Sequence, residues 1–189
     1  MKKEIRILGI DDMPFSFEDE YVDIVGVILR GNSYIEGVIK ATIEVDGMDA
    51  TPVIISLIKN TKHRGQLKVI MIDGIALGGF NVVDGGRIYD ETGIPVLTIT
   101  RNKPHSEKIK EALQKHFEDW EERWNIINKG RTEELCGKYP LYIKRFGIGI
   151  KEAEEVIKIS TIRGAIPEPL RIAHLIATGI KTGESYGKA

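Results

Sequence analysis

The fold is decided by the stretch Val69-Ile70-Met71-Ile72-Asp73-Gly74 and by a second run, Val96-Leu97-Thr98-Ile99, that follows Gly93-Ile94-Pro95. Wholly apolar runs of this length, separated by enough chain for a crossover, are typical of buried parallel strands in an α/β sheet. Ligands of such sheets bind beyond the carboxyl ends of the strands, which is where Asp73 falls. Because a carboxylate is costly to desolvate, we expect the protein to make use of Asp73.

Composition limits the class of protein before any motif does. A chain of 189 residues suits a single domain, residues 1–189, and its 42% hydrophobic and 29% charged content is ordinary for a soluble protein. The amino-terminal apolar segment, residues 5–10, has the length of a strand rather than of a signal peptide's apolar region, so we expect a cytoplasmic protein. One cysteine, Cys136, excludes an internal disulfide and a thiolate zinc cluster within one chain. The net charge of -1 disfavours binding of nucleic acid by gross electrostatics but allows a local basic groove.

The segments before the central run predict a small antiparallel unit. Residues 5–10, 21–29 and 34–45 have the apolar or alternating pattern of strands and are separated by turn residues, so they predict a three-stranded meander joined to the parallel pair. The first of these strands ends in Asp11-Asp12, which taken alone is the chemistry of a turn.

The remaining segments predict helices that cover the sheet. Thr51 and Pro52 have the character of an N-cap and a first helical position, and a glycine-rich loop follows Asp73. The predicted helices cover residues 52–60, 106–128, 151–159 and 169–177, the last closed by Gly179, with a polar connector over 130–137 and a fifth strand over 141–143. His174 lies at the edge of the last helix's buried face, where a lone histidine is more often structural than a ligand.

Three pieces of the chain, in order, resemble endonuclease V and hence the ribonuclease H-like nuclease fold. They are Gly9-Ile10-Asp11, the run from Val69 to Gly74 with Gly93 to Arg101 behind it, and Ile166-Pro167-Glu168-Pro169-Leu170-Arg171-Ile172-Ala173-His174. As a whole the sequence is similar to the DUF99 or UPF0215 family, which is related to endonuclease V. This resemblance implies a mixed sheet of three antiparallel strands plus parallel strands, flanked by helices.

The resemblance also implies a site that holds Mg²⁺ or Mn²⁺ for phosphodiester cleavage. Asp11 and Asp73 match the family's metal-binding aspartates, His174 matches a further ligand or proton shuttle, and Arg101 stands where the family has a lysine. The middle acid is not matched by position, since the family's glutamate falls on Ile43. Glu44, Asp46 and Asp49 remain candidates, with Asp46 the first choice as metal ligand and catalytic residue.

The residues expected to contact nucleic acid depart from the endonuclease V pattern. Glu36 replaces a proline of the segment that separates the strands, and Gly79-Phe80-Asn81 replaces the His-Pro-Arg of the pocket for a deaminated base. The resemblance therefore does not by itself carry recognition of hypoxanthine over to this chain. Tyr34 or Phe80 could stack on a base, and Asn81 and Arg171 are the further nucleic-acid contacts that we predict.

Two hypotheses about function follow from these residues. The first is a divalent-metal-dependent endonuclease or phosphodiesterase that acts on DNA or RNA. The second is a nucleic-acid-binding or regulatory relative that kept the scaffold and lost turnover, since a fold alone carries little functional information. Sequence leaves the base preference and the oligomeric state open.

Overall fold

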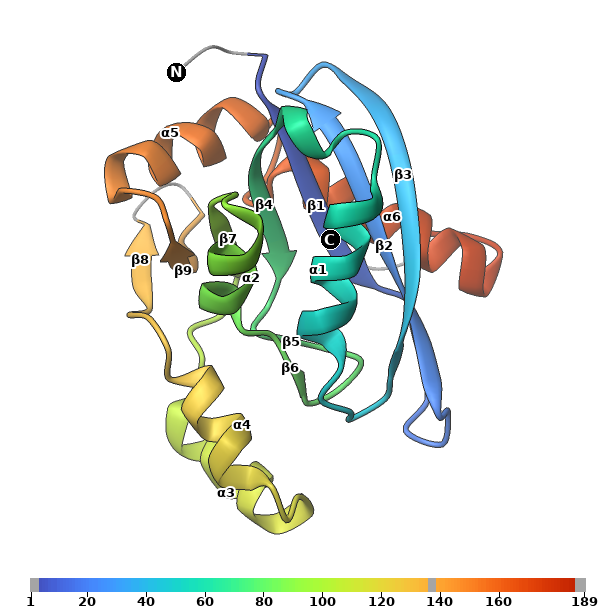
Figure 1. The fold of residues 1–189 in the computed structure, drawn as a ribbon, viewed down its shortest axis with the longest axis vertical. Helices are drawn as coiled ribbons and strands as arrows, with labels where there is room; N and C mark the ends of the chain where they lie inside the picture. The colour runs from blue at the N-terminus through green and yellow to red at the C-terminus, as the bar shows by residue number, and fades with distance from the viewer. Residues whose placement is uncertain (1–3, 136–138, 186–189) are drawn as a thin grey trace.

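The computed structural model describes residues 4–135 and 139–185, so Cys136 lies outside the described residues. Seven strands of the described part form one mixed sheet in the order β3-β2-β1-β4-β7-β9-β8, and β5 and β6 pair as a small separate hairpin (Figure 1). The strands are β1 (Arg6–Asp12), β2 (Tyr21–Arg30), β3 (Tyr34–Glu44), β4 (Leu67–Asp73), β5 (Ala76–Leu77), β6 (Asn81–Val82), β7 (Val96–Thr100), β8 (Glu133–Leu135) and β9 (Leu141–Phe146).

The strand pairings confirm the predicted core of the sheet. β1, β2 and β3 are antiparallel neighbours, and β4 is parallel to both β1 and β7. β9 is the expected fifth strand of this sheet, and it runs antiparallel to β7. The prediction that residues 130–137 are only a connector was wrong, because β8 pairs with β9 there and Glu133 forms an ion pair with Arg145 at 2.6 Å. A cross-strand charge pair thus compensates for the polar sequence of β8.

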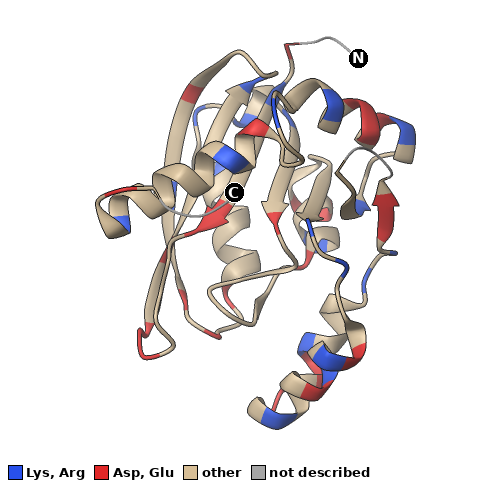
Figure 2. Cartoon of the chain, turned by 180° about the vertical axis from the view of Figure 1, so that it is seen from behind, with Lys and Arg blue, Asp and Glu red and all other residues tan. Residues whose placement is uncertain are grey.

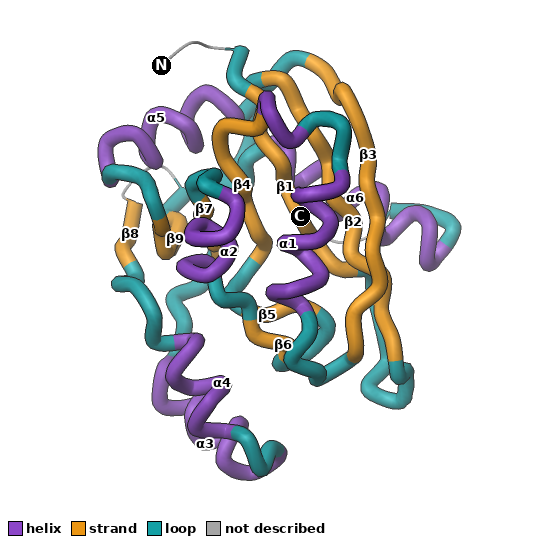
Figure 3. Tube along the Cα trace, viewed as in Figure 1, coloured by secondary structure: helices purple, strands orange, loops and turns teal. Residues whose placement is uncertain are grey.

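Helices cover both faces of the sheet (Figures 1 and 3). They are α1 (Ala50–Asn60), α2 (Gly85–Thr92), α3 (Ser106–His116), α4 (Trp120–Ile127), α5 (Ile150–Ser160) and α6 (Glu168–Thr182), and Arg64–Gln66 forms a 3-10 turn. Ile70 and Ile72 of β4 pack in the core that includes α1 and α2, whereas Val69 and Met71 pack in the core that includes α5 and the first turn of α6. This two-sided burial explains why the run is wholly apolar. No described helix has the length and apolar character needed to cross a membrane.

The predicted helix over 106–128 is wrong as a single helix, because it divides into α3 and α4. Phe117 has extended backbone angles, φ -133 and ψ 128, between the two. Its ring contacts Phe80 edge-on at 5.6 Å between centroids, and the Arg123 guanidinium lies 4.2 Å from its centroid. These contacts favour a break that the helical spacing of apolar residues does not reveal. The two helices extend beyond the sheet as an arm (Figure 1).

Two predicted helix ends were also displaced. α1 begins at Ala50 after Asp49, so Thr51 is inside the helix, where its hydroxyl accepts the Asp84 N–H at 2.9 Å instead of capping. α6 continues to Thr182 and ends at Gly183, whose φ of 82 is left-handed, while Gly179 lies in the last turn. The glycine-rich loop after Asp73 contains the β5–β6 hairpin.

Gly9 sets how closely α6 packs on β1. A Cβ atom at Gly9 would lie 2.3 Å from the carbonyl carbon of Pro169 and 2.7 Å from the nitrogen of Leu170. The obstacle is backbone rather than a flexible side chain, so the helix would have to move. Only glycine therefore allows this approach of α6 to the sheet.

We predict that Gly9→Ala destabilises the protein by at least about 2 kcal/mol, since overpacking against backbone costs about 1–3 kcal/mol or more. Urea unfolding measures the effect. Gly65→Ala is the matched control, because a Cβ there would meet nothing within 4 Å. Equal loss of stability in both variants would contradict this account of the packing.

Candidate active site

The register of β1 and β4 brings Asp11 and Asp73 to the same edge of the sheet. The strands are parallel with Ile10 opposite Ile72, so the next residue of each strand is an aspartate. Neighbouring strands lie about 4.8 Å apart, so these carboxylates are near neighbours. Figure 2 shows acidic residues at the tips of two adjacent central strands. The structure thus brings together two residues that are far apart in the sequence.

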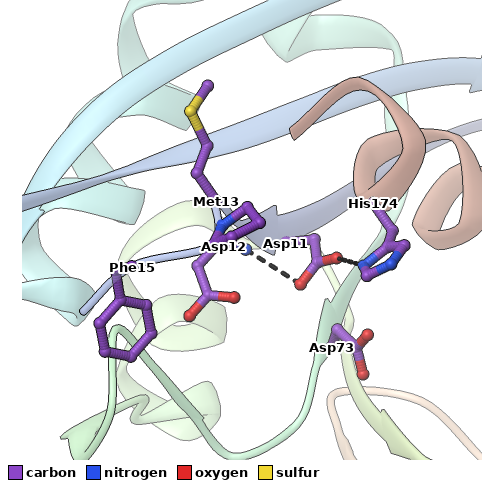
Figure 4. A pocket seen from close by; sticks show the side chains of 7 residues that line it. Asp11, Asp12, Met13, Phe15, Asp73 and His174 are labelled. Atoms are coloured by element: carbon purple, nitrogen blue, oxygen red, sulfur yellow. Dashed lines mark hydrogen bonds and ion pairs between the residues drawn. The ribbon is translucent and has the colours of Figure 1, made fainter. Parts of the chain in front are cut away.

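His174 joins this pair from α6. Its Nδ1 lies 2.9 Å from Oδ2 of Asp11, while Oδ1 of Asp11 accepts the Asp12 N–H at 2.9 Å (Figure 4). Gly9 lies two residues before Asp11 on the same face of β1, so the close approach of α6 at Gly9 delivers His174 to this carboxylate. Asp11 is buried and is held in position by these contacts.

Asp12 is a third carboxylate at this edge, and sequence reasoning assigned it only to a turn. Its Oδ2 accepts the Gly78 N–H at 2.5 Å, which ties β1 to the β5–β6 hairpin. The available signal was the pair of adjacent acids at the end of a buried strand. Successive side chains of a strand point to opposite faces of the sheet, so the sequence pattern predicts that only one of two adjacent acids faces a given site.

The three carboxylates and His174 line one pocket of about 430 Å³, together with Met13, Pro14 and Phe15 of the loop after β1. We call it the acidic pocket. It lies beyond the carboxyl ends of β1 and β4, where the parallel strands of an open α/β sheet place ligands. Figure 4 shows Asp11 between His174 and Asp12, with Asp73 close by on the neighbouring strand.

Burial raises the pKa values of two of these acids, and the charge of Asp11 adds to the effect. Burial, followed by the charge of Asp11, raises the pKa of Asp73 from 3.8 to about 7, although Arg101 opposes the shift. Burial also raises the pKa of Asp12 from 3.8 to about 6, against the stabilising N–H of Gly78. The pocket therefore holds protons at a pH at which ordinary carboxyl groups have lost them. A cation could take their place.

Asp46, the first choice for the middle acid from the sequence, does not line the acidic pocket. It is therefore not placed to act with Asp11 and Asp73. Its Oδ1 accepts the Phe80 N–H at 2.7 Å, and its N–H donates to the Gly78 carbonyl at 2.8 Å. Of the other candidates, Asp49 accepts N–H groups from Glu44 and Asn81, and Glu44 is exposed at the last position of β3. These acids organise the chain around the β5–β6 hairpin, because each backbone N–H there needs an acceptor.

The predicted nucleic-acid contacts are also dispersed. Tyr34 is half exposed, pairs with Arg30 in the β2–β3 register, and so lies at the opposite end of β1 from Asp11. Asn81 is buried, and its amide bonds Ala50 N–H, the Glu44 carbonyl and Asp49, which leaves it structural.

Arg101, Arg171 and Phe80 are not among the residues that line the acidic pocket. Arg101 follows β7 and acts electrostatically on Asp73. Arg171, one turn before His174, binds both carboxylate oxygens of the buried Glu168, at 2.8 and 2.5 Å. Phe80 packs against Phe117 in the arm and lines a different pocket.

Comparisons with solved structures define the class of fold. The chain is similar to human ENDOV with a TM-score of 0.60 and 18% identity, over 93% of this chain and 84% of that one. Endonuclease V of Ciona intestinalis, in complex with a 24mer DNA containing an inosine followed by a ribo-adenosine, gives a TM-score of 0.59 and 12% identity over 92% and 84%. The ribonuclease H-like fold expected from the sequence is confirmed.

Closer similarity defines the family. The model of the Endonuclease dU family matches residues 3–181, and the chain belongs to this family. A UPF0215 protein of Methanosarcina mazei is 54% identical over 193 residues, covering 100% of this chain and 97% of that protein. A protein of unknown function from Archaeoglobus fulgidus has a crystal structure with 41% identity and a TM-score of 0.85, over 94% and 98% of the two chains. The expected membership of the UPF0215 group is thereby confirmed.

The raised pKa of Asp73 predicts a pH-dependent cost to folding. Below pH 4 both folded and unfolded chains hold this proton, so there is no cost. As pH rises toward 7 the unfolded chain loses its proton first, and above 7 the full penalty, up to about 4 kcal/mol for a shift of this size, is present. We expect Asp73→Asn to stabilise the protein at pH 8 by about 1–3 kcal/mol and to have little effect at pH 4.

Urea unfolding at both pH values, without divalent metal, measures this difference. Asp90→Asn, which removes an exposed carboxyl group of α2, is the control and should show no such pH dependence. If Asp73→Asn were no more stable to urea than the parent protein at pH 8, the ionised carboxylate of Asp73 would impose no such cost on folding.

Proposed function

We propose that the protein is a divalent-metal-dependent endonuclease that cleaves nucleic acid in the acidic pocket. One observation carries the proposal: Asp11, Asp12 and Asp73 converge beside His174 at the carboxyl ends of two parallel strands. Three acids gathered with no Lys or Arg among the pocket-lining residues would repel one another by about 4 kcal/mol per pair at 4 Å with an effective dielectric of 20. Such a cost is consistent with a site that is completed by a cation.

The donor set fits Mg²⁺ or Mn²⁺. Carboxylate oxygens are the ligands that these ions prefer, and the raised pKa values of Asp12 and Asp73 mark positions where positive charge is favoured. Among the described residues, no group of three or more His, Cys, Asp or Glu side chains is placed so that it could hold a metal ion, which leaves two carboxylates as the protein's ligands. That arrangement suits Mg²⁺, which keeps several waters and commonly binds through one or two carboxylates and substrate phosphates.

Asp11 and Asp73 would hold the ion, with Asp12 as the third acid in place of Asp46. When bound, the ion would neutralise phosphate charge and lower the pKa of an attacking water. The chain's own residues would orient the reaction. Asp11 fixes the imidazole of His174 through Nδ1, and in the tautomer that donates from Nδ1 the other ring nitrogen keeps a lone pair that can accept a proton. Arg101, the cation that opposes the raised pKa of Asp73, would face the phosphate.

Names of relatives suggest the substrate to test first. The family description, Endonuclease dU, suggests DNA that contains deoxyuridine, and the Ciona intestinalis neighbour was solved with DNA containing inosine. We propose deoxyuridine-containing DNA as the substrate. The chain lacks the His-Pro-Arg expected of a hypoxanthine pocket and has Gly79-Phe80-Asn81 in that loop.

We predict cleavage of deoxyuridine-containing DNA with Mg²⁺ or Mn²⁺ and none with EDTA. Asp73→Asn should reduce kcat by about 10²–10³-fold, since removing one electrostatic group from an active site commonly costs this much. Asp90→Asn is the matched control and should retain full activity. Unmodified, inosine-containing and RNA strands of the same sequence define the preference. If the protein binds these strands without cleaving them, and if Asp73→Asn binds them equally well, the result would contradict the nuclease hypothesis. It would instead support the second hypothesis, a binding or regulatory relative.

We also predict that Mn²⁺ binds more tightly as pH rises from 5 to 8, with log Kd changing most steeply below about 6 and levelling off above about 7. Protons on Asp12 and Asp73 compete with the ion over this interval, since their pKa values are about 6 and about 7. Isothermal titration calorimetry at fixed ionic strength measures the affinity. A dissociation constant that does not change with pH would contradict binding at these acids.

A further inference from the structure

The long strand β3 lies at the edge of the sheet, so among the described residues it has a neighbouring strand, β2, on one side only. The Val45 N–H donates to the Glu20 carbonyl at 3.0 Å, toward β2. The preceding N–H, of Glu44, points the other way and donates to Asp49 at 3.1 Å. Because backbone groups alternate in direction along a strand, every second residue of β3 offers its N–H and carbonyl to a further strand. These residues are Val38, Lys40 and Thr42.

β3 lacks the features that usually protect an edge strand from pairing. Proteins commonly protect such edges with proline or with charged side chains, lysine above all. β3 contains no proline, and between its ends it carries two charges. Lys40 lies 2.6 Å from Asp23, and Glu36 forms an ion pair with Arg6. Because both charges are already paired, the edge does not suit a highly charged partner such as nucleic acid, and it fits another protein strand.

Apolar side chains of β3 are exposed on the face of the sheet that carries α6. Gly9, Val27 and Val38 lie opposite one another on β1, β2 and β3, and α6 packs on Gly9. Cross-strand neighbours share a face, so Val38 lies on the α6 side, where it is 50% exposed. Ile35 lies opposite Leu29, two residues after Val27, and is 46% exposed on the same face. This face of β3 therefore presents apolar surface to solvent.

The carboxyl-terminal end of α6 extends past β3, beyond the edge of the sheet (Figures 1 and 3). His174 and Lys181 contact carboxylates at the acidic end of the sheet, so they mark one flank of the helix. Ile176 and Ile180 are one turn apart on the other flank, which faces the turn between β2 and β3. Ile180 is 65% exposed. The projecting end of α6 thus carries apolar surface on the same side as Val38 and Ile35.

We infer that the protein forms a dimer in which β3 pairs antiparallel with β3 of a second copy. A two-fold axis perpendicular to the sheet pairs identical strands in this direction and keeps both α6 helices on the same face. The projecting end of each α6 then covers Val38 and Ile35 of the other copy with Ile180. This mutual cover favours a second copy over an unrelated strand, which would leave these side chains in water.

Two further properties of the chain suit this pairing. The net charge of each copy is only -1, so long-range repulsion between copies is small. β2 separates β3 from β1, so the acidic pocket stays outside the interface. The dimer therefore does not rest on the proposed function.

Sedimentation velocity over a range of protein concentrations measures the oligomeric state of the intact chain. The parent protein should sediment with twice the mass of one chain. Val38→Lys places an unpaired charge on the exposed edge and should sediment as a monomer. Ile162→Lys, which changes an apolar side chain that is 61% exposed in the segment between α5 and α6, is the matched control and should remain a dimer.

Ile180→Glu is the second variant, because it tests the cover by α6 without changing β3. It should also shift the protein from dimer toward monomer. Hydrogen exchange locates the interface, since the N–H groups of Val38, Lys40 and Thr42 should exchange slowly in the parent and rapidly in Val38→Lys. Thermal unfolding checks that each variant is folded.

The outcomes separate this inference from the proposed nuclease. Loss of the dimer in both variants supports the interface even if no nucleic acid is cleaved, and Val38→Lys should cleave as the parent does. A parent protein that sediments as a monomer, or a dimer that Val38→Lys leaves intact, would overturn the inference even if cleavage occurs. Dissociation by Val38→Lys but not by Ile180→Glu would overturn the part assigned to α6.

Discussion

The parallel pairing of β1 with β4 is the constraint on which the structure depends. With Ile10 opposite Ile72, both strands end in an aspartate at the same edge of the sheet. A shift of one residue would turn one of these carboxylates to the opposite face. Apolar side chains bury both faces of β4, so the register is fixed by the core on either side. The core therefore determines where the acids meet.

The rest of the candidate site is added to this edge by two long-range contacts. Gly9 admits α6 close to β1, and the helix then carries His174 to Asp11. The β5–β6 hairpin donates the Gly78 N–H to Asp12 and so closes the other side. The raised pKa values of two acids show that the folded chain is under electrostatic strain there. Sites that serve chemistry commonly cost stability in this way, and a bound cation would relieve the strain.

The sequence predicted the parts of this structure that depend on local pattern. Asp73 follows an apolar run and Asp11 ends a strand, so both could be assigned to the sheet edge. Asp46 could not be placed, because its position depends on hydrogen bonds to a hairpin more than thirty residues later in the chain. The place of Asp12 in the pocket could not be predicted for the same reason, since its hydrogen-bond partner is Gly78 of the distant hairpin. The division of α3 from α4 at Phe117 likewise depends on tertiary contacts with Phe80 and Arg123, which helical periodicity does not encode.

The most direct test of the account is a crystal of the protein soaked in Mn²⁺ and measured for anomalous scattering. The account predicts an anomalous peak between the carboxylates of Asp11 and Asp73, within ligand distance of both, with water or Asp12 completing the shell. An ordered Mn²⁺ bound elsewhere, with these two side chains unchanged and no peak between them, would contradict it.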